Sequence, residues 1–227
     1  MRITAVIFDL DDTLYDENQY FAEVITAVCL RYSLNRERML YMLNSHRFKR
    51  SRDIFGDLLR DQGQFTPELQ EAMFSLYRTI DCNILLASDV RSLLTRLREA
   101  DVRIALLTNG DVLAQRNKVR VLDIEGFVDH VVYARDQGKQ YEKPSPLAFK
   151  RALSALRASP SETLFVGDNS YTDIYGASRV GLTTIWLNDG SMFCEGADFV
   201  IENLSELFPI MRSLHESNLN HDAVGEP

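Results

Sequence analysis

An apolar run that stops at a group of acids lies at the N-terminus of this 227-residue chain. Residues 3–8 read Ile-Thr-Ala-Val-Ile-Phe, and Asp9, Asp11 and Asp12 follow directly. A continuous, β-branched apolar segment is typical of a buried parallel strand. Ligands bind beyond the carboxyl ends of the strands in open α/β sheets, so chemistry is expected at Asp9 and Asp11. Carboxylates this close repel each other, and a bound divalent cation relieves the repulsion. An ordinary acidic turn is the alternative for this stretch alone.

Similar strand-like runs recur in the second half of the chain, with helical patterns between them. They cover residues 103–107, 128–133, 163–166, 183–187 and 199–201. Strands that alternate with helices indicate βαβ units and a parallel sheet. The sequence therefore predicts an α/β fold with a Rossmann-like parallel sheet core.

Residues 17–83 show only helical periodicity. Four helices are expected, and the last opens at Thr66-Pro67, an N-cap followed by proline at the first helical position. A connection this long between two strands predicts an α-helical cap inserted into the α/β domain. We expect an α/β core of residues 1–15 and 86–215, a helical cap of residues 16–85 and a polar C-terminal tail of residues 216–227. Ser88 is expected to cap the helix that follows the insert.

Composition restricts the partners of the chain. The net charge of −8 gives no general attraction to nucleic acid or to an anionic membrane. The three cysteines, Cys29, Cys82 and Cys194, are scattered, which favours a reducing compartment over a disulfide scaffold. Neither a signal-peptide pattern nor a run of membrane-spanning length is present. We expect a cytoplasmic monomer or homodimer that acts on a small molecule, without a nucleic-acid polymer or a membrane as partner.

Two further predicted strand ends carry residues that suit an anionic ligand. The run 103–107 is followed by Thr108, Asn109 and Gly110, whose hydroxyl and backbone amides are suited to phosphate oxygens. Lys143 comes just before Pro144 and the next helical pattern, where it can neutralise a phosphate and a carboxylate. A plain strand-to-helix turn and a solvated surface lysine are the alternatives.

The run 163–166 ends in Gly167-Asp168, with Asp173 five residues further on. Gly167 permits a close approach of the backbone. Oxygen ligands without His or Cys suit magnesium rather than zinc, so Asp168 is a candidate metal ligand and Asp173 a supporting one. An acidic loop before a helix is the alternative.

Taken together, these four strand ends resemble the four motifs of the haloacid dehalogenase (HAD) superfamily. The matching segments are Asp9-x-Asp11-x-Thr13, Thr108-Asn109-Gly110, Lys143-Pro144 and Gly167-Asp168-x₄-Asp173. The helical insert resembles the subfamily with an α-helical cap. Many members have glycine where this chain has Asp12, and Asp is a frequent variant there.

The resemblance implies a Mg²⁺-dependent phosphatase that acts on a small phosphomonoester such as a sugar phosphate, a nucleotide or a phosphoglycolate-like acid. Asp9 is then the nucleophile that forms an aspartyl-phosphate, and Asp11 is the general acid and base. Magnesium is held by the Asp9 carboxylate, the Asp11 main-chain carbonyl and the Asp168 carboxylate, with support from Asp173.

The remaining motif residues take the phosphate or brace the site in the same resemblance. Thr108, Asn109 and Lys143 bind the phosphate. Thr13 orients Asp11 or braces the turn, and Gly110 and Gly167 support the loops.

Three alternatives differ in reaction class. Dehalogenation needs only the nucleophilic Asp, because halide leaves without a proton, so Asp11 favours phosphoryl transfer. A phosphomutase of the β-phosphoglucomutase type shares the motifs and stays open. A non-catalytic phosphate-binding or regulatory protein on the same fold is of another class. Such a protein is expected to lack at least one of Asp9, Asp11, Lys143 and Asp168, all of which are present.

A basic cluster in the predicted cap is the one hint about the substrate. The segment 45–52 reads Ser-His-Arg-Phe-Lys-Arg-Ser-Arg. Arg47, Lys49 and Arg50 are candidates for binding a second anionic group of the substrate. A solvated helix face or loop is the alternative for such a charged run.

Overall fold

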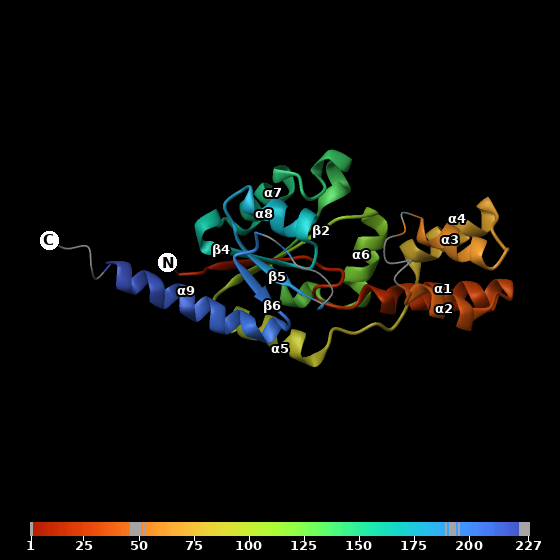
Figure 1. The fold of residues 1–227 in the computed structure, drawn as a ribbon, viewed down its shortest axis with the longest axis horizontal. Helices are drawn as coiled ribbons and strands as arrows, with labels where there is room; N and C mark the ends of the chain where they lie inside the picture. Colours follow the sequence, from red (N-terminus) through yellow and green to blue (C-terminus); the bar gives the residue numbers. More distant parts are fainter. Residues whose placement is uncertain are drawn as a thin grey trace. The chain divides into compact units, whose positions relative to one another are not determined.

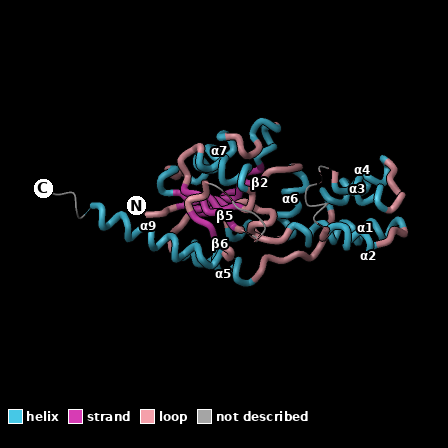
Figure 2. Tube along the Cα trace, viewed as in Figure 1, coloured by secondary structure: helices cyan, strands magenta, loops and turns pink. Residues whose placement is uncertain are grey.

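Six parallel strands form one sheet in the computed structural model, which describes residues 2–45, 51, 53–188, 190, 194 and 196–222. The strand order is β3-β2-β1-β4-β5-β6, and Figure 2 shows the strands gathered in one layer. Their bounds are β1 Ala5–Phe8, β2 Arg103–Thr108, β3 His130–Tyr133, β4 Thr163–Gly167, β5 Thr183–Leu187 and β6 Phe199–Ile201. The predicted α/β class and all the predicted strands are confirmed.

The central strand β1 pairs with β2 on one side and β4 on the other. Phe8 is in register with Leu106 of β2 and with Val166 of β4, so the three strands end at the same edge. The chain runs outward in one direction from β1 through β2 to β3, and in the other from β4 through β5 to β6. The strand order therefore reverses between β1 and β4, and ligands bind at this point in doubly wound sheets.

Helices cover both faces of this sheet. In Figure 1, α7 (Pro146–Leu156) and α8 (Gly176–Ser178) lie on one side, and α5 (Ser88–Glu99) and α9 (Leu207–Asp222) on the other. Alternate strand residues point to the same face. Ala5, Ile7 and Phe165 accordingly share one buried cluster with Phe149 of α7. The rings of Phe149 and Phe165 meet edge to face at 5.2 Å, and burying one such ring contributes about 2 kcal/mol.

Short turns complete this part of the chain. They are η1 (Glu125–Phe127), η2 (Ala134–Gln137), η3 (Lys139–Tyr141), η4 (Pro160–Glu162), η6 (Leu204–Glu206) and the π-helical turn η5 (Ser170–Tyr175). The turn η5 directly follows β4 and the Gly-Asp pair, so it begins at the edge of the sheet where β1 also ends.

The chain divides into two compact units. The α/β unit contains Met1–Tyr15, Leu85–Val112 and Asp123–Pro227, and the helical unit contains Asp16–Ile84 and Leu113–Leu122. The helical unit is built from α1 (Glu17–Tyr32), α2 (Arg36–Leu43), α3 (Ile54–Asp61), α4 (Pro67–Thr79) and most of α6 (Val112–Val121). The predicted N-cap is present, because the Thr66 side chain accepts a hydrogen bond from the Leu69 amide.

Three details differ from the sequence-based expectation. Residues 113–122 group with the helical unit, although a core position was expected for them. Residues 216–222 belong to α9, so this part of the expected polar tail is helical. Ser88 is the first residue of α5 and Ala87 is its N-cap, without a side-chain hydrogen bond; the predicted Ser88 cap is wrong. The predicted boundaries of core, cap and tail otherwise stay a prediction.

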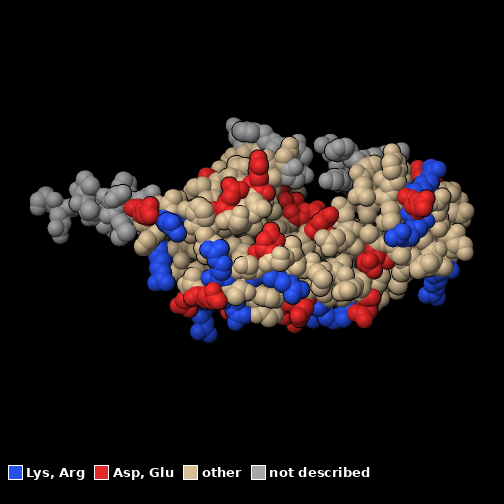
Figure 3. All heavy atoms as spheres, turned by 90° about the horizontal axis from the view of Figure 1, so that it is seen from below, with Lys and Arg blue, Asp and Glu red and all other residues tan. Residues whose placement is uncertain are grey.

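Surface charge and helix composition bear on possible partners. On the face drawn in Figure 3, basic side chains are mixed with acidic ones. Among the described residues, no helix is both long enough and apolar enough to cross a membrane.

Candidate active site

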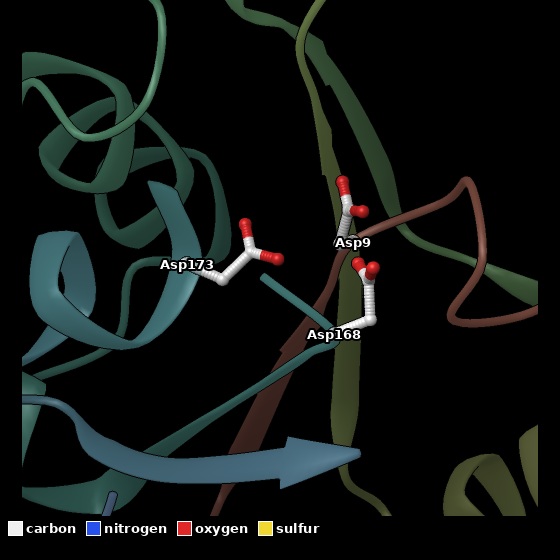
Figure 4. Close-up of side chains that lie close together, drawn as sticks. All are labelled: Asp9, Asp168 and Asp173. Carbon is white, nitrogen blue, oxygen red and sulfur yellow. The ribbon is translucent and has the colours of Figure 1, made fainter. Parts of the chain in front are cut away.

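Three carboxylates converge beyond the carboxyl ends of β1 and β4. Asp9 follows β1, Asp168 follows β4 and Asp173 lies in the turn η5. Each offers one oxygen that lies within 4.8 Å of the oxygens of the other two. The carboxyl groups of Asp168 and Asp173 point toward Asp9 (Figure 4). The amide of Asp9 donates to the carbonyl of Val166 at 2.9 Å, so Asp9 is fixed against the end of β4.

Lys143 places a buried cation among these acids. Its Nζ lies 2.5 Å from Asp9 Oδ1 and 2.7 Å from Asp173 Oδ1, and the residue is only 5% exposed. Nζ also lies 5.6 Å from the centroid of the Phe165 ring, which gives a cation–π contact. Lys143 thus pairs with two of the predicted candidates, Asp9 and Asp173, and an oxygen of Asp168 lies within 4.8 Å of both acids.

The main chain of Lys143 is held by the side chain of Asn109. Asn109 Nδ2 donates to the carbonyl of Lys143 at 2.9 Å, and Asn109 Oδ1 accepts from the amide of Lys143 at 2.8 Å. This reciprocal pair ties the loop after β2 to the Lys143-Pro144 segment. The Asn109 side chain therefore positions Lys143.

Glu142 holds the same loop from a second point. Its Oε1 accepts from the Gly110 amide at 3.2 Å and pairs with the Arg135 guanidinium at 2.8 Å. The Gly110 amide, expected as a phosphate donor, is therefore bonded to Glu142. Thr108, the remaining predicted member of this loop, is buried and 1% exposed.

Asp11 and Thr13 have separate hydrogen-bond partners. The hydroxyl of Tyr15, a buried residue, donates to Asp11 Oδ1 at 2.7 Å. Thr13 Oγ1 instead donates to Asp168 Oδ1 at 3.5 Å, a long bond. Tyr15 thus contacts Asp11, while Thr13 links the loop after β1 to the end of β4.

The segment after β4 is held close to its neighbours. A Cβ atom on Gly167 would lie 2.4 Å from Asp173 Oδ2, so only glycine lets Asp173 fold back onto the strand end. The Asn169 amide donates to Asp173 Oδ2 at 3.1 Å. Trp186 Nε1, from β5, donates to the main-chain carbonyl of Asp168 at 2.8 Å. These bonds fix the orientation of both acids.

The crowding of acids changes their protonation. Burial raises the pKa of Asp9 well above its usual value, Lys143 acts against this, and Asp173, Asp168 and Asp11 raise it further. Burial, with the charges of Asp173 and Asp12, raises the pKa of Asp168 to about 7 against the opposing charge of Lys143. Burial lowers the pKa of Lys143, but Asp173 and Asp9 outweigh it and the pKa lies above the ordinary value. Lys143 therefore stays charged, and its single positive charge does not neutralise the acids around it.

The donor set fits a hard divalent cation. Its side-chain ligands are carboxylate oxygens of Asp9, Asp168 and Asp173, and hard cations such as Mg²⁺ prefer oxygen ligands. A cation there would also lower the raised pKa values of Asp9 and Asp168, because it favours the charged form of each carboxyl.

The site opens into a small hollow of about 180 Å³. Its lining residues are Asp9, Asp11, Asp12, Thr108, Asn109, Lys143, Asp168, Asn169 and Thr172. A larger hollow of about 370 Å³ includes Arg103 and His130, the first residues of β2 and β3, and so lies at the opposite end of the sheet. The Arg103 guanidinium donates there to the carbonyls of Leu156 and Arg157 at the end of α7, which is a structural role.

Sequence reasoning missed three residues that contact the site. Tyr15 stands six positions after Asp9, between Leu14 and Asp16, and Glu142 directly precedes Lys143. Trp186 is the single tryptophan of the chain and lies in a strand-like run, where a core position is the natural interpretation. Only its place at the end of a neighbouring strand indicates a contact with the site. The candidates Arg47, Lys49 and Arg50 lie outside the described residues.

Comparison with known proteins shows which family this chain belongs to. The family model of the haloacid dehalogenase-like hydrolases matches residues 3–181. This chain belongs to the haloacid dehalogenase-like hydrolase family. It is 28% identical to glyceraldehyde 3-phosphate phosphatase from Pyrococcus furiosus, over 92% of this chain and 93% of that one. It is 31% identical to human N-acylneuraminate-9-phosphatase, over 82% of this chain and 83% of that one.

A solved structure shares the fold of this HAD-like chain. The putative HAD-hydrolase YfnB from Bacillus subtilis superposes with a TM-score of 0.73 at 20% identity, over 93% of this chain and 100% of that one. The prediction of a HAD-like phosphoric monoester hydrolase is confirmed by the family match and by the phosphatases among its relatives.

Proposed function

We propose that this HAD-like enzyme is a Mg²⁺-dependent phosphatase that hydrolyses a small phosphomonoester through an aspartyl-phosphate on Asp9. The observation that carries this proposal is Lys143 Nζ, which lies 2.5 Å from Asp9 Oδ1 and 2.7 Å from Asp173 Oδ1 in a buried setting. An anionic nucleophile repels an anionic phosphate strongly when both are out of water. A cation fixed on the nucleophile reduces that repulsion, so the arrangement suits phosphoryl transfer.

The metal would be held by the carboxylates of Asp9 and Asp168 and by the main-chain carbonyl of Asp11, with Asp173 in support. When bound, magnesium supplies positive charge to the phosphate oxygens and to the carboxylates around it. The oxygen-only donor set supports this choice. The YfnB structure from Bacillus subtilis is described as bound to magnesium, which supports it by analogy.

In the first step a carboxylate oxygen of Asp9 forms a bond to phosphorus, and the bond from phosphorus to the leaving oxygen breaks. Lys143, the Thr108 hydroxyl and the Asn109 amide hold the phosphate oxygens. Asp11 gives its proton to the leaving alkoxide, so the product leaves as a neutral alcohol. The Tyr15 hydroxyl, 2.7 Å from Asp11 Oδ1, keeps the acid in one orientation.

In the second step Asp11 takes a proton from a water molecule, and the oxygen of that water forms a bond to phosphorus. The bond between phosphorus and the Asp9 oxygen breaks, which returns Asp9 as a carboxylate and releases inorganic phosphate. Asp11 is protonated again and ready for the next substrate.

The names of the relatives support a small substrate, but the leaving groups of these substrates differ from one relative to the next. Their names include glyceraldehyde 3-phosphate and N-acylneuraminate 9-phosphate phosphatases, and a putative pyrophosphatase from Caldanaerobacter subterraneus that is 27% identical. An aldehyde-bearing leaving group is uncharged, whereas the leaving group of pyrophosphate is an anion.

Phosphate release from a panel of small phosphomonoesters, with and without Mg²⁺, tests the proposal. We expect release that requires Mg²⁺ and falls about a thousandfold in Asp9→Asn, because the amide is a poor nucleophile. Asp101→Asn is the matched control, since Asp101 is exposed and lies between α5 and β2, at the opposite end of the sheet. Metal-independent release, or full activity in Asp9→Asn, would overturn the proposal.

A further inference from the structure

Glu142 joins two loops that follow neighbouring strands of the α/β unit. β2 ends at Thr108 and β3 at Tyr133, and these two residues are in register, so the loops that follow begin side by side. Gly110 lies in the loop after β2, and Arg135 lies in the turn η2 after β3. Oε1 of Glu142 accepts from the Gly110 amide at 3.2 Å and lies 2.8 Å from both Nε and Nη2 of Arg135. A single carboxylate oxygen therefore holds both loops.

The position of this carboxylate is itself fixed. The Glu142 amide donates to the carbonyl of Lys139 at 3.1 Å, and the Glu142 carbonyl accepts from the Ser145 amide at 2.9 Å. The side chain is only 14% exposed, and the Arg135 guanidinium meets its charge. Hydrogen bonds to an ionised group are stronger than those between neutral groups. The Gly110 amide is thus bonded to a strong acceptor that is held in place.

The loop after β2 is tied to the Lys143-Pro144 segment at a neighbouring point. The Asn109 side chain exchanges two hydrogen bonds with the main chain of Lys143, at 2.9 and 2.8 Å. Adjacent residues of the loop are therefore bonded to adjacent residues of the segment. A single link would let the loop turn about it, whereas two neighbouring links restrict that rotation. The Glu142 bond therefore sets where Thr108 lies relative to the Lys143 ammonium group.

Glu142 acts from outside the hollow. Thr108, Asn109 and Lys143 line the hollow. Neither Glu142 nor Gly110 is among the lining residues that the structure describes. Gly110 has a φ of +111°, a conformation that residues with a side chain rarely adopt, and the bond to Glu142 holds the loop in this turn. Glu142 therefore affects the proposed chemistry only through the groups that it holds.

We infer that Glu142 is a positioning residue of this site. Its Oε1 atom holds the Gly110 amide, and with it the loop after β2, in the place that the Lys143 ammonium group requires. A displacement of about 1 Å between reacting groups costs about a hundredfold in rate, so a bond that sets this spacing affects turnover without touching the substrate. The inference rests on the proposed phosphatase function, which assigns the phosphate to Thr108, Asn109 and Lys143.

Two conservative variants separate reach from charge at this position. Glu142→Gln keeps an oxygen at the place of Oε1 and loses the charge. Its amide nitrogen replaces Oε2, which bonds to none of the described residues. Glu142→Asp keeps the charge, but its side chain is one methylene shorter, so the 3.2 Å bond to Gly110 is lost. We expect kcat/KM for the best phosphomonoester to fall about tenfold in Glu142→Asp and to stay within about threefold of wild type in Glu142→Gln.

A second measurement distinguishes positioning from a general loss of structure. Orthovanadate mimics the phosphoryl group during transfer, so its inhibition constant reports on the loop after β2 and on Lys143. The dissociation constant of Mg²⁺ reports instead on the carboxylates beyond β1 and β4. In Glu142→Asp the vanadate constant should rise about tenfold, while the Mg²⁺ constant from calorimetry stays within about twofold of wild type. A merely structural role of Glu142 would change both constants or neither.

The control is Asp136→Ala, which breaks a pair of the same kind in the same turn, η2. Asp136 directly follows Arg135, and its Oδ1 lies 2.8 Å from Nη1 of Arg151 in α7. Within the described residues, this side chain bonds to Arg151 and not to the loop after β2. Both kcat/KM and the vanadate constant should therefore stay at their wild-type values.

Three results would overturn the inference. They are wild-type kinetics in Glu142→Asp, a loss in Glu142→Gln equal to that in Glu142→Asp, and a Mg²⁺ affinity that falls together with the vanadate affinity. A failure of the phosphatase proposal has another signature, because the wild type would then release no phosphate from any ester. Calorimetric binding of vanadate to the Mg²⁺-loaded wild type and variants compares them without turnover, so the two failures are distinguishable.

Discussion

Among the residues that the structure describes, one lysine is buried in each of the two units, and the two are neutralised in different ways. In the α/β unit, Lys143 lies in a cluster of carboxylates at the carboxyl ends of the strands. In the helical unit, the fully buried Lys118 pairs with Glu17 at 2.5 Å, and its Nζ lies 5.0 Å from the Tyr77 ring centroid and 5.5 Å from that of Tyr20. Tyr77 also donates to the same Glu17 oxygen at 3.0 Å.

The difference is one of charge balance. Around Lys118, a carboxylate and two aromatic faces meet the charge, which ties α1, α4 and α6 together. Around Lys143, acids outnumber the cation, and burial together with the neighbouring acids raises the pKa values of Asp9 and Asp168. A buried lysine is therefore not by itself a mark of function. An incomplete charge balance around it is, because a metal or a ligand can complete it.

Activity gives the largest expected contrast between the two lysines. Lys143→Met should lower kcat/KM for a phosphomonoester about a thousandfold, because it removes the fixed charge beside the nucleophile. Lys118→Met should stay within about threefold of wild type, since the Glu17, Tyr20 and Tyr77 side chains that it contacts belong to the helical unit. Steady-state phosphate release, with circular dichroism to check the fold, measures both. Losses of similar size would contradict the distinction.

Stability should separate the lysines in the opposite sense to activity. Lys118→Met should lower the free energy of unfolding by about 2–3 kcal/mol, because Glu17 loses its buried partner while the methionine keeps most of the packing. Urea unfolding at neutral pH measures the change. Lys139→Met serves as the comparison, since Lys139 is exposed. A loss no greater than that of Lys139→Met would mean that the Lys118 pair contributes little.

The raised pKa of Asp168 gives a pH dependence with a definite sign. The pKa rises from the ordinary 3.8 to about 7, so between these values the folded protein holds a proton that the unfolded chain has lost. Without metal, this contribution to stability is present at low pH and is lost as the pH rises toward neutrality. The difference in Tm between Asp168→Asn and wild type should therefore be several degrees more in favour of the variant at about pH 8 than at about pH 5.

Thermal unfolding of the metal-free proteins at both pH values checks this sign. In wild type, added Mg²⁺ should restore stability more at the higher pH, because the ligands must be deprotonated to bind. Equal pH profiles of Asp168→Asn and wild type would show that this carboxyl is not the group that titrates.

The smallest expected effect concerns Trp186, which would act on metal binding through its hydrogen bond to Asp168. Trp186→Phe removes the hydrogen bond to the Asp168 carbonyl but keeps a ring in the core, so Mg²⁺ affinity should fall about tenfold. Calorimetry measures this directly. Trp186 is the single tryptophan of the chain, so wild-type fluorescence should also respond to Mg²⁺. An unchanged affinity in the variant would leave Trp186 with a packing role only.

Most of the α/β unit could be predicted from local patterns. Its strands are short apolar runs, and Asp9 and Asp168 directly follow two of them. Asp9, Lys143 and Asp168 could be named as candidates because their motifs together resemble those of the HAD superfamily. Their convergence follows from the parallel sheet, because neighbouring strands end at one edge.

The remaining features depend on contacts that no local pattern contains. Lys118 belongs to a segment that reads as an ordinary helix, where a lysine is expected in solvent. Tyr15 and Trp186 reach the site only through tertiary structure, and neither carries a polar motif. Ser88 lies one position inside the helix that it was expected to cap, since helix boundaries vary by a residue or two.

Trapping the intermediate tests the central claim, that the carboxylate held by Lys143 is the nucleophile. The enzyme would be mixed with Mg²⁺ and its best phosphomonoester, quenched rapidly and reduced with borohydride, which converts an acyl phosphate to an alcohol. Peptide mass spectrometry then locates the reduced residue. We predict reduction at Asp9, and none at Asp9 when substrate is omitted. Reduction at another acid, or an unmodified Asp9 during rapid turnover in quenches taken across the first turnover, would contradict the account.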